Sequence, residues 1–179
     1  MSGRLIAIVG PSGVGKDSVM SALAAHDPRF KLARRVITRP SDAGGEDFDG
    51  VSELEFLARE AEGDFALSWP AHGLHYAIPV DVDALLQDGY DVLANLSRSV
   101  LVQANTRFER FDVINLTTKR EVLAKRLAER GRETAEQIAL RLDRVATLPA
   151  GIQAHEIDNS GALTDTVQAV MASLYPVKA

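Results

Sequence analysis

The sequence contains no cysteine, which excludes disulfide bonds, thiolate metal sites and a cysteine nucleophile. Basic residues are fewer than acidic ones, 20 against 25, so a broad nucleic-acid surface is not expected and positive charge should act locally. No apolar run approaches the roughly 18 residues of a membrane span. Because the first apolar strand begins at once, we expect no signal peptide. We therefore expect a cytoplasmic protein that binds neither nucleic acid nor membrane.

A glycine-rich segment follows the first apolar run, residues 5–9. Gly10, Gly15 and Lys16 fit the phosphate-binding pattern G-x-x-x-x-G-K. The glycines let successive backbone N–H groups point at one anion, and the following helix adds its positive end. The dinucleotide pattern G-x-G-x-x-G fails, because Ser18 stands where its third glycine belongs. We expect ATP to bind the phosphate loop, whose residues are Gly10, Pro11, Ser12, Gly13, Val14, Gly15, Lys16, Asp17 and Ser18.

Two positions that hold magnesium in many such proteins are altered here. Asp17 follows the lysine, where the usual residue is a Ser or Thr whose hydroxyl holds Mg²⁺. The predicted strand 91–96 also lacks a carboxylate at its carboxyl end, where Asn95 stands. Our hypothesis is that Asp17 supplies the missing negative charge from inside the loop. Ser18 is the second candidate ligand.

Strands alternate with helices along most of the chain, which predicts an α/β fold with a mainly parallel sheet and helices on both faces. The predicted strands cover residues 5–9, 30–37, 91–96, 111–116 and 155–158. Capping boxes at Ser52, Thr118 and Thr134 predict the starts of helices. Right-handed crossovers place ligands at the carboxyl ends of the strands, where the phosphate loop also lies.

Residues 38–78 break this alternation. A polar stretch over 38–50 precedes a predicted helix and then a predicted hairpin of residues 65–69 and 74–78. A loop this long in a compact domain is usually functional or disordered. We interpret 38–78 as an acceptor-binding insertion in a single domain spanning 1–179, whose core is 1–37 and 79–179.

Phosphoryl transfer depends on positioning and charge neutralisation, so arginines are the next candidates. A group of them flanks a glycine-containing break between two helices: Arg130, Arg132, Arg141 and Arg144. We interpret residues 130–145 as a mobile lid whose arginines stabilise the transferring phosphoryl group. The alternative is an exposed helical hairpin with ordinary surface arginines.

Other cations and one hydroxyl are candidates for binding the acceptor. Arg35 and Arg39 lead into the polar loop, and Arg98 follows a strand end at the first turn of a helix. A cation is unfavourable there unless an anion binds nearby; the alternative for all three is solvated surface charge. Tyr76 can offer its hydroxyl to a phosphate. His72 and His75 have ligand-like spacing but no evident third ligand, so a metal site there is disfavoured.

Together these residues resemble the guanylate kinase-like P-loop phosphotransferases over essentially the whole chain. The resemblance implies a five-stranded parallel core, an acceptor-binding insertion and a lid. It rests on Gly10 to Lys16, Thr38-Arg39-Pro40 with Gly45-Glu46, Val51-Ser52 with Phe56, Tyr76, Arg130-Gly131-Arg132-Glu133 with Arg141, and Asp158-Asn159.

The departures from this pattern concern the acceptor. Guanylate kinases read guanine with a serine, a glutamate and a Ser/Thr at positions that hold Arg35, Ser68 and Ile78 here. Losing such polar partners costs about 10⁴-fold in discrimination, which disfavours a purine acceptor. The second phosphate-binding arginine of the family, after the proline, is also absent.

The same departures resemble one branch of the superfamily, the ribose 1,5-bisphosphate phosphokinases of phosphonate metabolism. The segments 16–18 and 95–98 contribute to this resemblance. It implies ATP- and Mg²⁺-dependent conversion of ribose 1,5-bisphosphate to 5-phosphoribosyl 1-diphosphate (PRPP), with ADP released. The alternatives are a divergent guanylate kinase, which GMP-dependent ADP formation would reveal, and a non-catalytic interaction module. The sequence leaves the oligomeric state open, a homodimer included.

Overall fold

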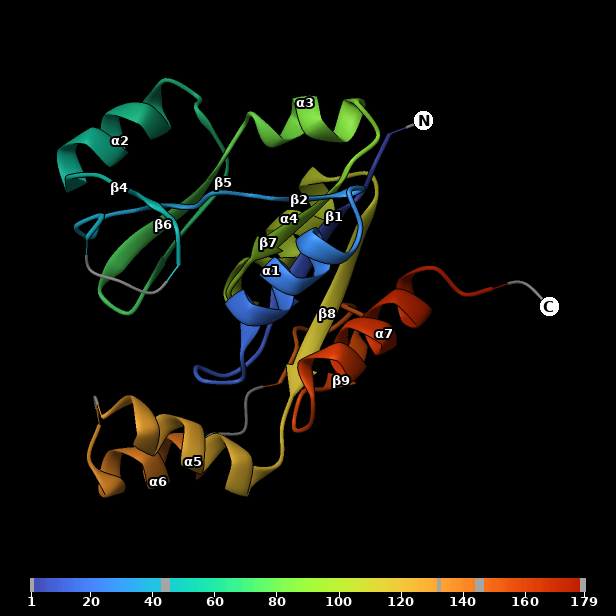
Figure 1. Ribbon diagram of the computed structural model, residues 1–179. Helices are drawn as coiled ribbons and strands as arrows, with labels where there is room; N and C mark the ends of the chain where they lie inside the picture. Colours follow the sequence, from blue (N-terminus) through green and yellow to red (C-terminus); the bar gives the residue numbers. More distant parts are fainter. Residues whose placement is uncertain (1, 43–45, 132, 144–146, 178–179) are drawn as a thin grey trace.

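A five-stranded parallel sheet forms the centre of the computed structural model, which describes residues 2–42, 46–131, 133–143 and 147–177 (Figure 1). The strand order is β2 (Phe30–Leu32), β7 (Asp91–Asn95), β1 (Leu5–Val9), β8 (Phe111–Thr117) and β9 (His155–Asp158). Every neighbouring pair in this sheet is parallel. The five-stranded parallel core implied by the sequence resemblance is confirmed.

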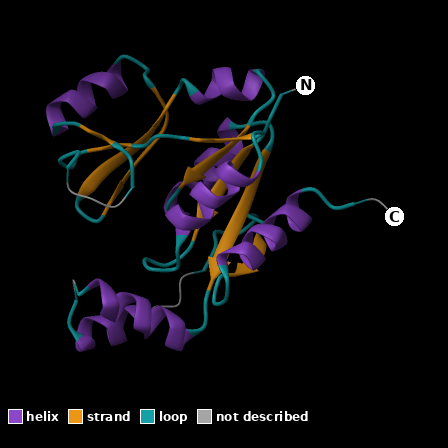
Figure 2. Cartoon of the chain, in the orientation of Figure 1, coloured by secondary structure: helices purple, strands orange, loops and turns teal. Residues whose placement is uncertain are grey.

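Helices cover both faces of this sheet (Figure 2), as the alternation of strands and helices predicted. On one face, α1 (Lys16–His26) and α7 (Leu163–Leu174) bury Leu23 and Val170 against the sheet residues Ile6 and Ile8. On the other face lie α3 (Val82–Gln87), the short 3-10 helix η1 (Arg98–Val100) and α4 (Leu101–Arg107). Among the described residues, no helix combines the length and the apolar character that crossing a membrane requires.

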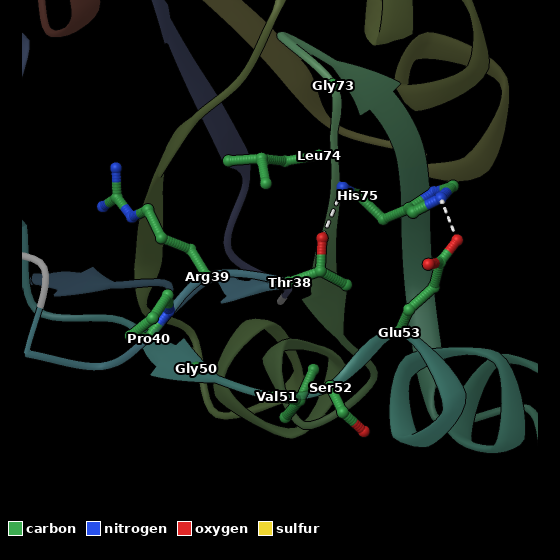
Figure 3. Close-up of a pocket in the computed structure, with 10 residues that line it drawn as sticks. All are labelled: Thr38, Arg39, Pro40, Gly50, Val51, Ser52, Glu53, Gly73, Leu74 and His75. Carbon is green, nitrogen blue, oxygen red and sulfur yellow. Dashed lines mark hydrogen bonds and ion pairs between the residues drawn. The ribbon is translucent and has the colours of Figure 1, made fainter.

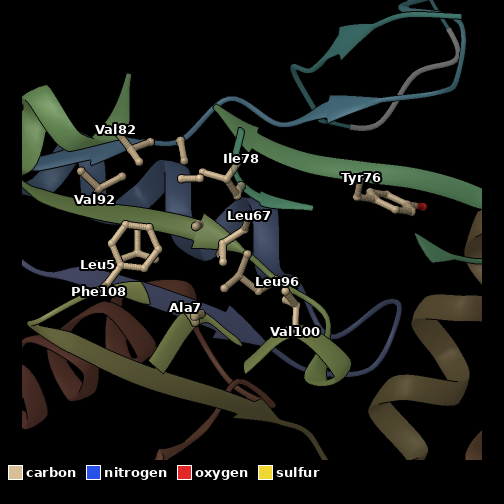
Figure 4. Close-up of a cluster of buried hydrophobic side chains, with 14 of the residues drawn as sticks. Leu5, Ala7, Leu67, Tyr76, Ile78, Val82, Val92, Leu96, Val100 and Phe108 are labelled. Atoms are coloured by element: carbon tan, nitrogen blue, oxygen red, sulfur yellow. The ribbon is translucent and has the colours of Figure 1, made fainter. Parts of the chain in front are cut away.

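A second sheet is built from residues 36–79 in the order β4 (Asp49–Gly50), β3 (Val36–Ile37), β6 (Leu74–Pro79) and β5 (Phe65–Ala71). Its helix is α2 (Glu53–Ala61), where the Ser52 hydroxyl accepts a hydrogen bond from the Glu55 amide as the capping box predicted. Apolar residues of this sheet share one cluster with the central sheet (Figure 4): Leu67 and Ile78 pack with Leu5 and Val92. The two sheets are thus joined through a continuous core.

The strand predicted over 30–37 is wrong in its extent, because the chain divides it between the two sheets. The Ala33 amide still donates to Leu93 in the central sheet, at 2.8 Å. The next two side chains then bond to the polar loop instead: Arg34 donates to the Phe48 carbonyl, and Arg35 pairs with Glu46. These interactions draw the chain off β7 and into the second sheet as β3.

Two further helices, α5 (Arg120–Arg130) and α6 (Ala135–Asp143), pack through Leu123, Leu127 and Ile138. The capping box at Thr134 is confirmed by reciprocal hydrogen bonds with Gln137. The one predicted at Thr118 is wrong, because α5 has Lys119 as its N-cap. Ser160 takes the capping hydroxyl's place, since its Oγ accepts from the Lys119 amide at 2.7 Å and bonds the Thr118 hydroxyl.

Candidate active site

The phosphate loop connects the carboxyl end of β1 to α1 and closely approaches two other elements. Gly13 and Gly15 have positive φ angles of 90° and 102°. A Cβ atom on Gly15 would lie 2.7 Å from Asn159 Nδ2, and one on Gly13 would lie 2.9 Å from a methyl group of Leu127. Glycine is therefore required here both for the backbone conformation and for the space.

Side chains from distant parts of the chain fix the loop through its backbone. Asn159, buried after β9, donates to the Val14 carbonyl at 2.7 Å and accepts from the Thr166 hydroxyl at 2.6 Å. Arg126 of α5 donates to the carbonyls of Val14 and Asn159 at 3.0 and 2.8 Å. Sequence reasoning included Asn159 only in a motif and missed Arg126. Their spacing from the loop offered no local signal.

Lys16 begins α1, and its Nζ donates to the Gly10 carbonyl at 2.7 Å. Burial lowers the pKa of Lys16 to about 8, and the positive charges of Arg35 and Arg98 act in the same direction. The nearby carboxylate of Asp17 partly opposes this effect. A phosphate anion beside this ammonium group would raise its pKa again and so favour its charged form.

A cavity of about 330 Å³ opens beside the phosphate loop, and we call it the phosphate-loop cavity. It combines residues from the loop, the end of β7, the β5–β6 hairpin and α6. His72 reaches it from the tight hairpin turn, with φ 53°, next to Gly73 with φ 74°. The lining residues are Val9, Gly10, Pro11, Ser12, Lys16, Arg35, His72, Tyr76, Asn95, Leu96, Ser97, Arg98 and Arg141.

Arg35 lies in the wall of this cavity and is only 9% exposed. Both Glu46 carboxylate oxygens accept from its guanidinium, Oε2 from Nε at 2.8 Å and Oε1 from Nη2. The guanidinium also lies over the Tyr76 ring, 4.9 Å from its centroid. The charge of Arg35 is thus matched by a carboxylate that sequence reasoning did not assign to the site.

Arg98 reaches the same cavity from η1. Its Nε atom is buried and has no hydrogen-bond partner among the described residues. Burial lowers the pKa of Arg98, while the charge of Glu156 opposes this shift. The preceding residue, Ser97, does not cap the helix with its side chain; its hydroxyl accepts from the Trp69 indole at 2.9 Å. Trp69, a buried core residue, therefore also joins the hairpin to the end of β7.

The two candidate magnesium ligands lie in different surroundings. Asp17 lies near Asn95 at the carboxyl end of β7, whose side chain lowers the pKa of Asp17 slightly. Desolvation by the surrounding protein and the charge of Glu46 raise the pKa of Asp17, against the opposing effects of Arg35 and Lys16. Ser18 instead lines a groove of about 500 Å³ with Gly13, Gly15, Arg126, Glu129, Arg130, Asn159, Gly161 and Leu163.

The described arginines of the predicted lid both reach the neighbourhood of the phosphate loop. Arg130 Nη1 donates to the Ser12 hydroxyl at 3.3 Å. Arg141 lines the phosphate-loop cavity and pairs with Glu133 through two contacts of 3.0 and 2.9 Å. Arg132 and Arg144, the other predicted lid arginines, lie outside the described residues.

Arg39 is placed apart from this group, in a second cavity of about 420 Å³ in the insertion (Figure 3). Its guanidinium lies over the Phe48 ring, 4.3 Å from the centroid. In the same cavity the Thr38 hydroxyl accepts from the His75 amide, and the His75 ring faces Glu53 at 3.7 Å. His72 and His75 therefore line different cavities.

Among the described residues, no group of three or more His, Asp or Glu side chains could hold a metal ion. A Mg²⁺ ion is usually bound through one or two carboxylates, water and substrate phosphates. Asp17, with the Asn95 amide beside it, offers suitable oxygen ligands near the loop.

Comparison with solved structures shows the fold. A guanylate kinase from Anaplasma phagocytophilum matches 97% of this chain and 85% of its own, with a TM-score of 0.66 and 17% identity. A gluconokinase from Sinorhizobium meliloti 1021 matches with a TM-score of 0.54, covering 97% of this chain and 91% of its own at 18% identity. At these identities only the fold is shared with certainty.

Comparison with known sequences shows the family, although no family model matches. A ribose 1,5-bisphosphate phosphokinase PhnN of Ruegeria sp. strain TM1040 is 52% identical, covering 99% of this chain and 94% of the relative. The corresponding protein of Agrobacterium fabrum is 47% identical over 95% of each chain. A bifunctional ribose 1,5-bisphosphokinase-thymidine phosphorylase of Cupriavidus pinatubonensis is 41% identical over 90% of this chain and 27% of its own. With relatives this similar over nearly its full length, the chain belongs to the ribose 1,5-bisphosphate phosphokinase family of guanylate kinase-like P-loop kinases.

Proposed function

We propose that this protein transfers the terminal phosphoryl group of ATP to ribose 1,5-bisphosphate, forming PRPP and ADP. The bond between this phosphorus and the bridging oxygen of ADP breaks, and a bond forms to an oxygen of the acceptor's 1-phosphate. One observation carries the proposal beyond the family assignment. The phosphate-loop cavity is lined by Lys16, Arg35, Arg98 and Arg141, which suits an acceptor with two phosphates and no base.

The donor phosphates would lie in the phosphate loop, held by its backbone N–H groups and by Lys16. Lys16 would leave the Gly10 carbonyl, which it now bonds at 2.7 Å, and bind the β- and γ-phosphates. Arg130, at the Ser12 hydroxyl, and Arg141, at the cavity wall, would stabilise charge on the transferring group. The rest of the nucleotide would extend along the groove that contains Ser18 and Asn159.

Asp17 is the residue that we assign to Mg²⁺. When bound, the ion would neutralise phosphate charge on the donor. Asp17 replaces the loop hydroxyl of related enzymes, and its contact with Asn95 puts a carboxylate where the strand itself supplies none. We assign Ser18 to the nucleotide groove rather than to the metal, because it lines that groove.

The acceptor would bind mainly through Arg98, whose buried Nε has no partner among the described residues. A phosphate at this position would satisfy that donor and offset the burial of the guanidinium. Tyr76, from the hairpin, faces the same cavity and would donate its hydroxyl. Arg39 lies in the second cavity, within residues 38–78, and would contact the acceptor only from there. No general base is assigned, because the attacking phosphate oxygen is already anionic.

The guanylate kinase alternative has less support at the acceptor side. Ser68, which we aligned with the guanine-reading glutamate, donates to Glu60 of α2 at 2.7 Å. Ile78, aligned with the Ser/Thr, is fully buried in the core. Neither residue lines the phosphate-loop cavity, so neither would meet a base bound there.

Product identification tests the proposal directly. Purified protein would be incubated with ATP, Mg²⁺ and ribose 1,5-bisphosphate, and the products followed by ³¹P NMR. We expect ADP and a new diphosphate resonance pair on the sugar to appear in equal amounts. The Lys16→Met variant is the control for contaminating kinases. ADP accompanied only by inorganic phosphate, with no sugar diphosphate, would contradict the proposal.

A further inference from the structure

The pairing of Arg35 with Glu46 brings opposite charges together at a buried position. The Arg35 side chain is 10% exposed and that of Glu46 is 14% exposed. Both carboxylate oxygens accept hydrogen bonds from the guanidinium group, in the planar bidentate geometry that arginine favours. A buried pair of this kind resists separation, because removing one partner leaves an uncompensated charge. The pair is therefore a fixed part of the cavity wall.

The same pair covers an aromatic surface. The Arg35 guanidinium lies 4.9 Å from the Tyr76 ring centroid, and the Trp69 ring stacks on Tyr76 with a centroid distance of 5.7 Å and an interplanar angle of 13°. Proteins commonly hold single nucleobases by stacking them on exposed aromatic rings. Here the ring that lines the cavity already has two stacking partners.

The pair also limits how Arg35 can meet a ligand. Glu46 takes Nε and one hydrogen of Nη2, and Nη1 is directed at the Asn95 carbonyl with a long contact of 3.4 Å. A phosphate could reach the remaining Nη1 edge without displacing Glu46. A neutral base would gain little from this edge and would have to displace a bonded ion pair to reach Tyr76.

We propose that Arg35 and Glu46 together determine acceptor specificity, a proposal that rests on the proposed function. The pair excludes nucleotide acceptors and admits a phosphorylated sugar that carries no base. Glu46 holds Arg35 across Tyr76, and Arg35 fills the place of a base. Glu46 is thus a positioning residue that acts through Arg35, and Arg35 is the residue that contacts the ligand.

The test compares acceptor affinities rather than turnover alone. Trp69 is the single tryptophan and stacks on Tyr76, so its fluorescence reports ligand binding in the cavity. Kd values for GMP, AMP and ribose 1,5-bisphosphate would be measured with wild-type protein and with two double variants, Arg35→Ala/Glu46→Ala and Arg35→Met/Glu46→Gln. Each double variant removes both charges and leaves no unpaired one. Arg35→Met/Glu46→Gln keeps more of the side-chain volume and remains available if the alanine variant does not fold.

The control is an Arg107→Ala/Asp83→Ala double variant, which removes an exposed ion pair of 2.7 Å between α4 and α3, outside the phosphate-loop cavity. We expect the preference for the sugar bisphosphate over GMP to fall at least about tenfold in both variants of the Arg35–Glu46 pair, mainly through tighter GMP binding. The control should keep the wild-type preference. If the pair had a purely structural role, its loss would weaken the binding of all ligands by the same factor and leave the preference unchanged. An unchanged preference would therefore overturn the proposal.

The same data separate this inference from the proposed function. If wild-type protein does not phosphorylate ribose 1,5-bisphosphate, the proposed function fails. The GMP and AMP affinities of the variants still decide the role of the pair. Nucleotide affinity that rises in the variants of the Arg35–Glu46 pair supports it in either case, and nucleotide affinity that stays at the wild-type level contradicts it.

Discussion

The proposed active site has a donor side, which is the phosphate loop, and an acceptor side, which is the cavity wall around Arg35, and the two are held together by different kinds of contact. On the donor side, side chains bond to backbone carbonyls: Asn159 and Arg126 both donate to Val14, and Lys16 donates to Gly10. On the acceptor side, side chains bond to one another, as in Arg35 with Glu46 and Trp69 with Ser97. The first kind of contact depends on the path of the chain, and the second on the identity of each partner.

This difference explains how a common fold can accept different substrates. A loop that binds phosphates through its backbone tolerates sequence change around it, provided that Gly15 and Lys16 remain. A wall made of paired side chains changes its chemistry when one pair is replaced. We therefore expect substitution of Gly15 or Lys16 on the donor side to impair transfer whatever the acceptor, and substitutions on the acceptor side to change which acceptor is used.

Replacing Lys16 by Met should have the largest effect. Without its charge on the donor phosphates, we expect kcat to fall about 10³-fold. Acceptor binding should persist, because Arg98 and Tyr76 are unchanged. Steady-state kinetics would measure the first effect and Trp69 fluorescence the second. Equal losses of turnover and of acceptor binding would show that the two sides are not separable.

Replacing Arg98 by Ala should act on the acceptor alone. Loss of a charge-assisted contact to phosphate should raise the KM for ribose 1,5-bisphosphate about 10- to 100-fold, with the KM for ATP little changed. Arg98→Lys should recover part of the loss. Arg107→Ala is the matched control, since Arg107 of α4 pairs with Asp83 of α3 at 2.7 Å, outside the phosphate-loop cavity. A rise in the KM for ATP alone would contradict this assignment of Arg98.

Replacing Gly15 by Ala tests the close approach of the loop to Asn159. With φ at 102° and the Asn159 amide 2.7 Å from the added Cβ, we expect a loss of about 2 kcal/mol in unfolding free energy and weaker ATP binding. Gly151→Ala provides the comparison, because Gly151 has φ 83° but no atom within 4 Å of a Cβ. Chemical denaturation should show a smaller loss for Gly151→Ala, and its ATP affinity should not change.

The affinity for ATP should depend on pH through Lys16. In the protein without ATP, the pKa of Lys16 is lowered to about 8. The Lys16 side chain is therefore charged below this pH and loses its charge as the pH rises through it. ATP affinity should therefore fall about tenfold between pH 7 and pH 9, with proton uptake on binding near pH 8. Calorimetry in buffers of different ionisation enthalpy measures both. In Lys16→Arg this step should disappear, because a guanidinium stays charged over this range.

The structure of the phosphate loop was largely predictable from the sequence, because its signal is local. The apolar run, the glycines and Lys16 are consecutive, and α1 begins at Lys16 as expected. The acceptor side was predicted only as a set of arginines. The Glu46 partner of Arg35 lies across the polar loop, and the contact between Trp69 and Ser97 joins two separate elements. No periodicity or short motif encodes such pairings.

The division of the predicted strand 30–37 has the same cause. As a run of apolar and basic residues it resembles one strand, and its first half does extend the central sheet. The side chains of Arg34 and Arg35 then bond to residues of the loop that follows. A tertiary interaction thereby outweighed the local preference for a continuous strand.

The cavity wall predicts that this kinase phosphorylates a sugar bisphosphate and rejects a nucleotide acceptor. The most direct test is ADP release by the wild-type protein with ATP and Mg²⁺, measured in parallel with ribose 1,5-bisphosphate and with GMP. We expect kcat/KM to favour the sugar bisphosphate by about 10⁴-fold, as for a site without polar partners for a base. Equal or greater turnover with GMP would contradict this prediction, since the cavity would then read a base despite Arg35 and Glu46.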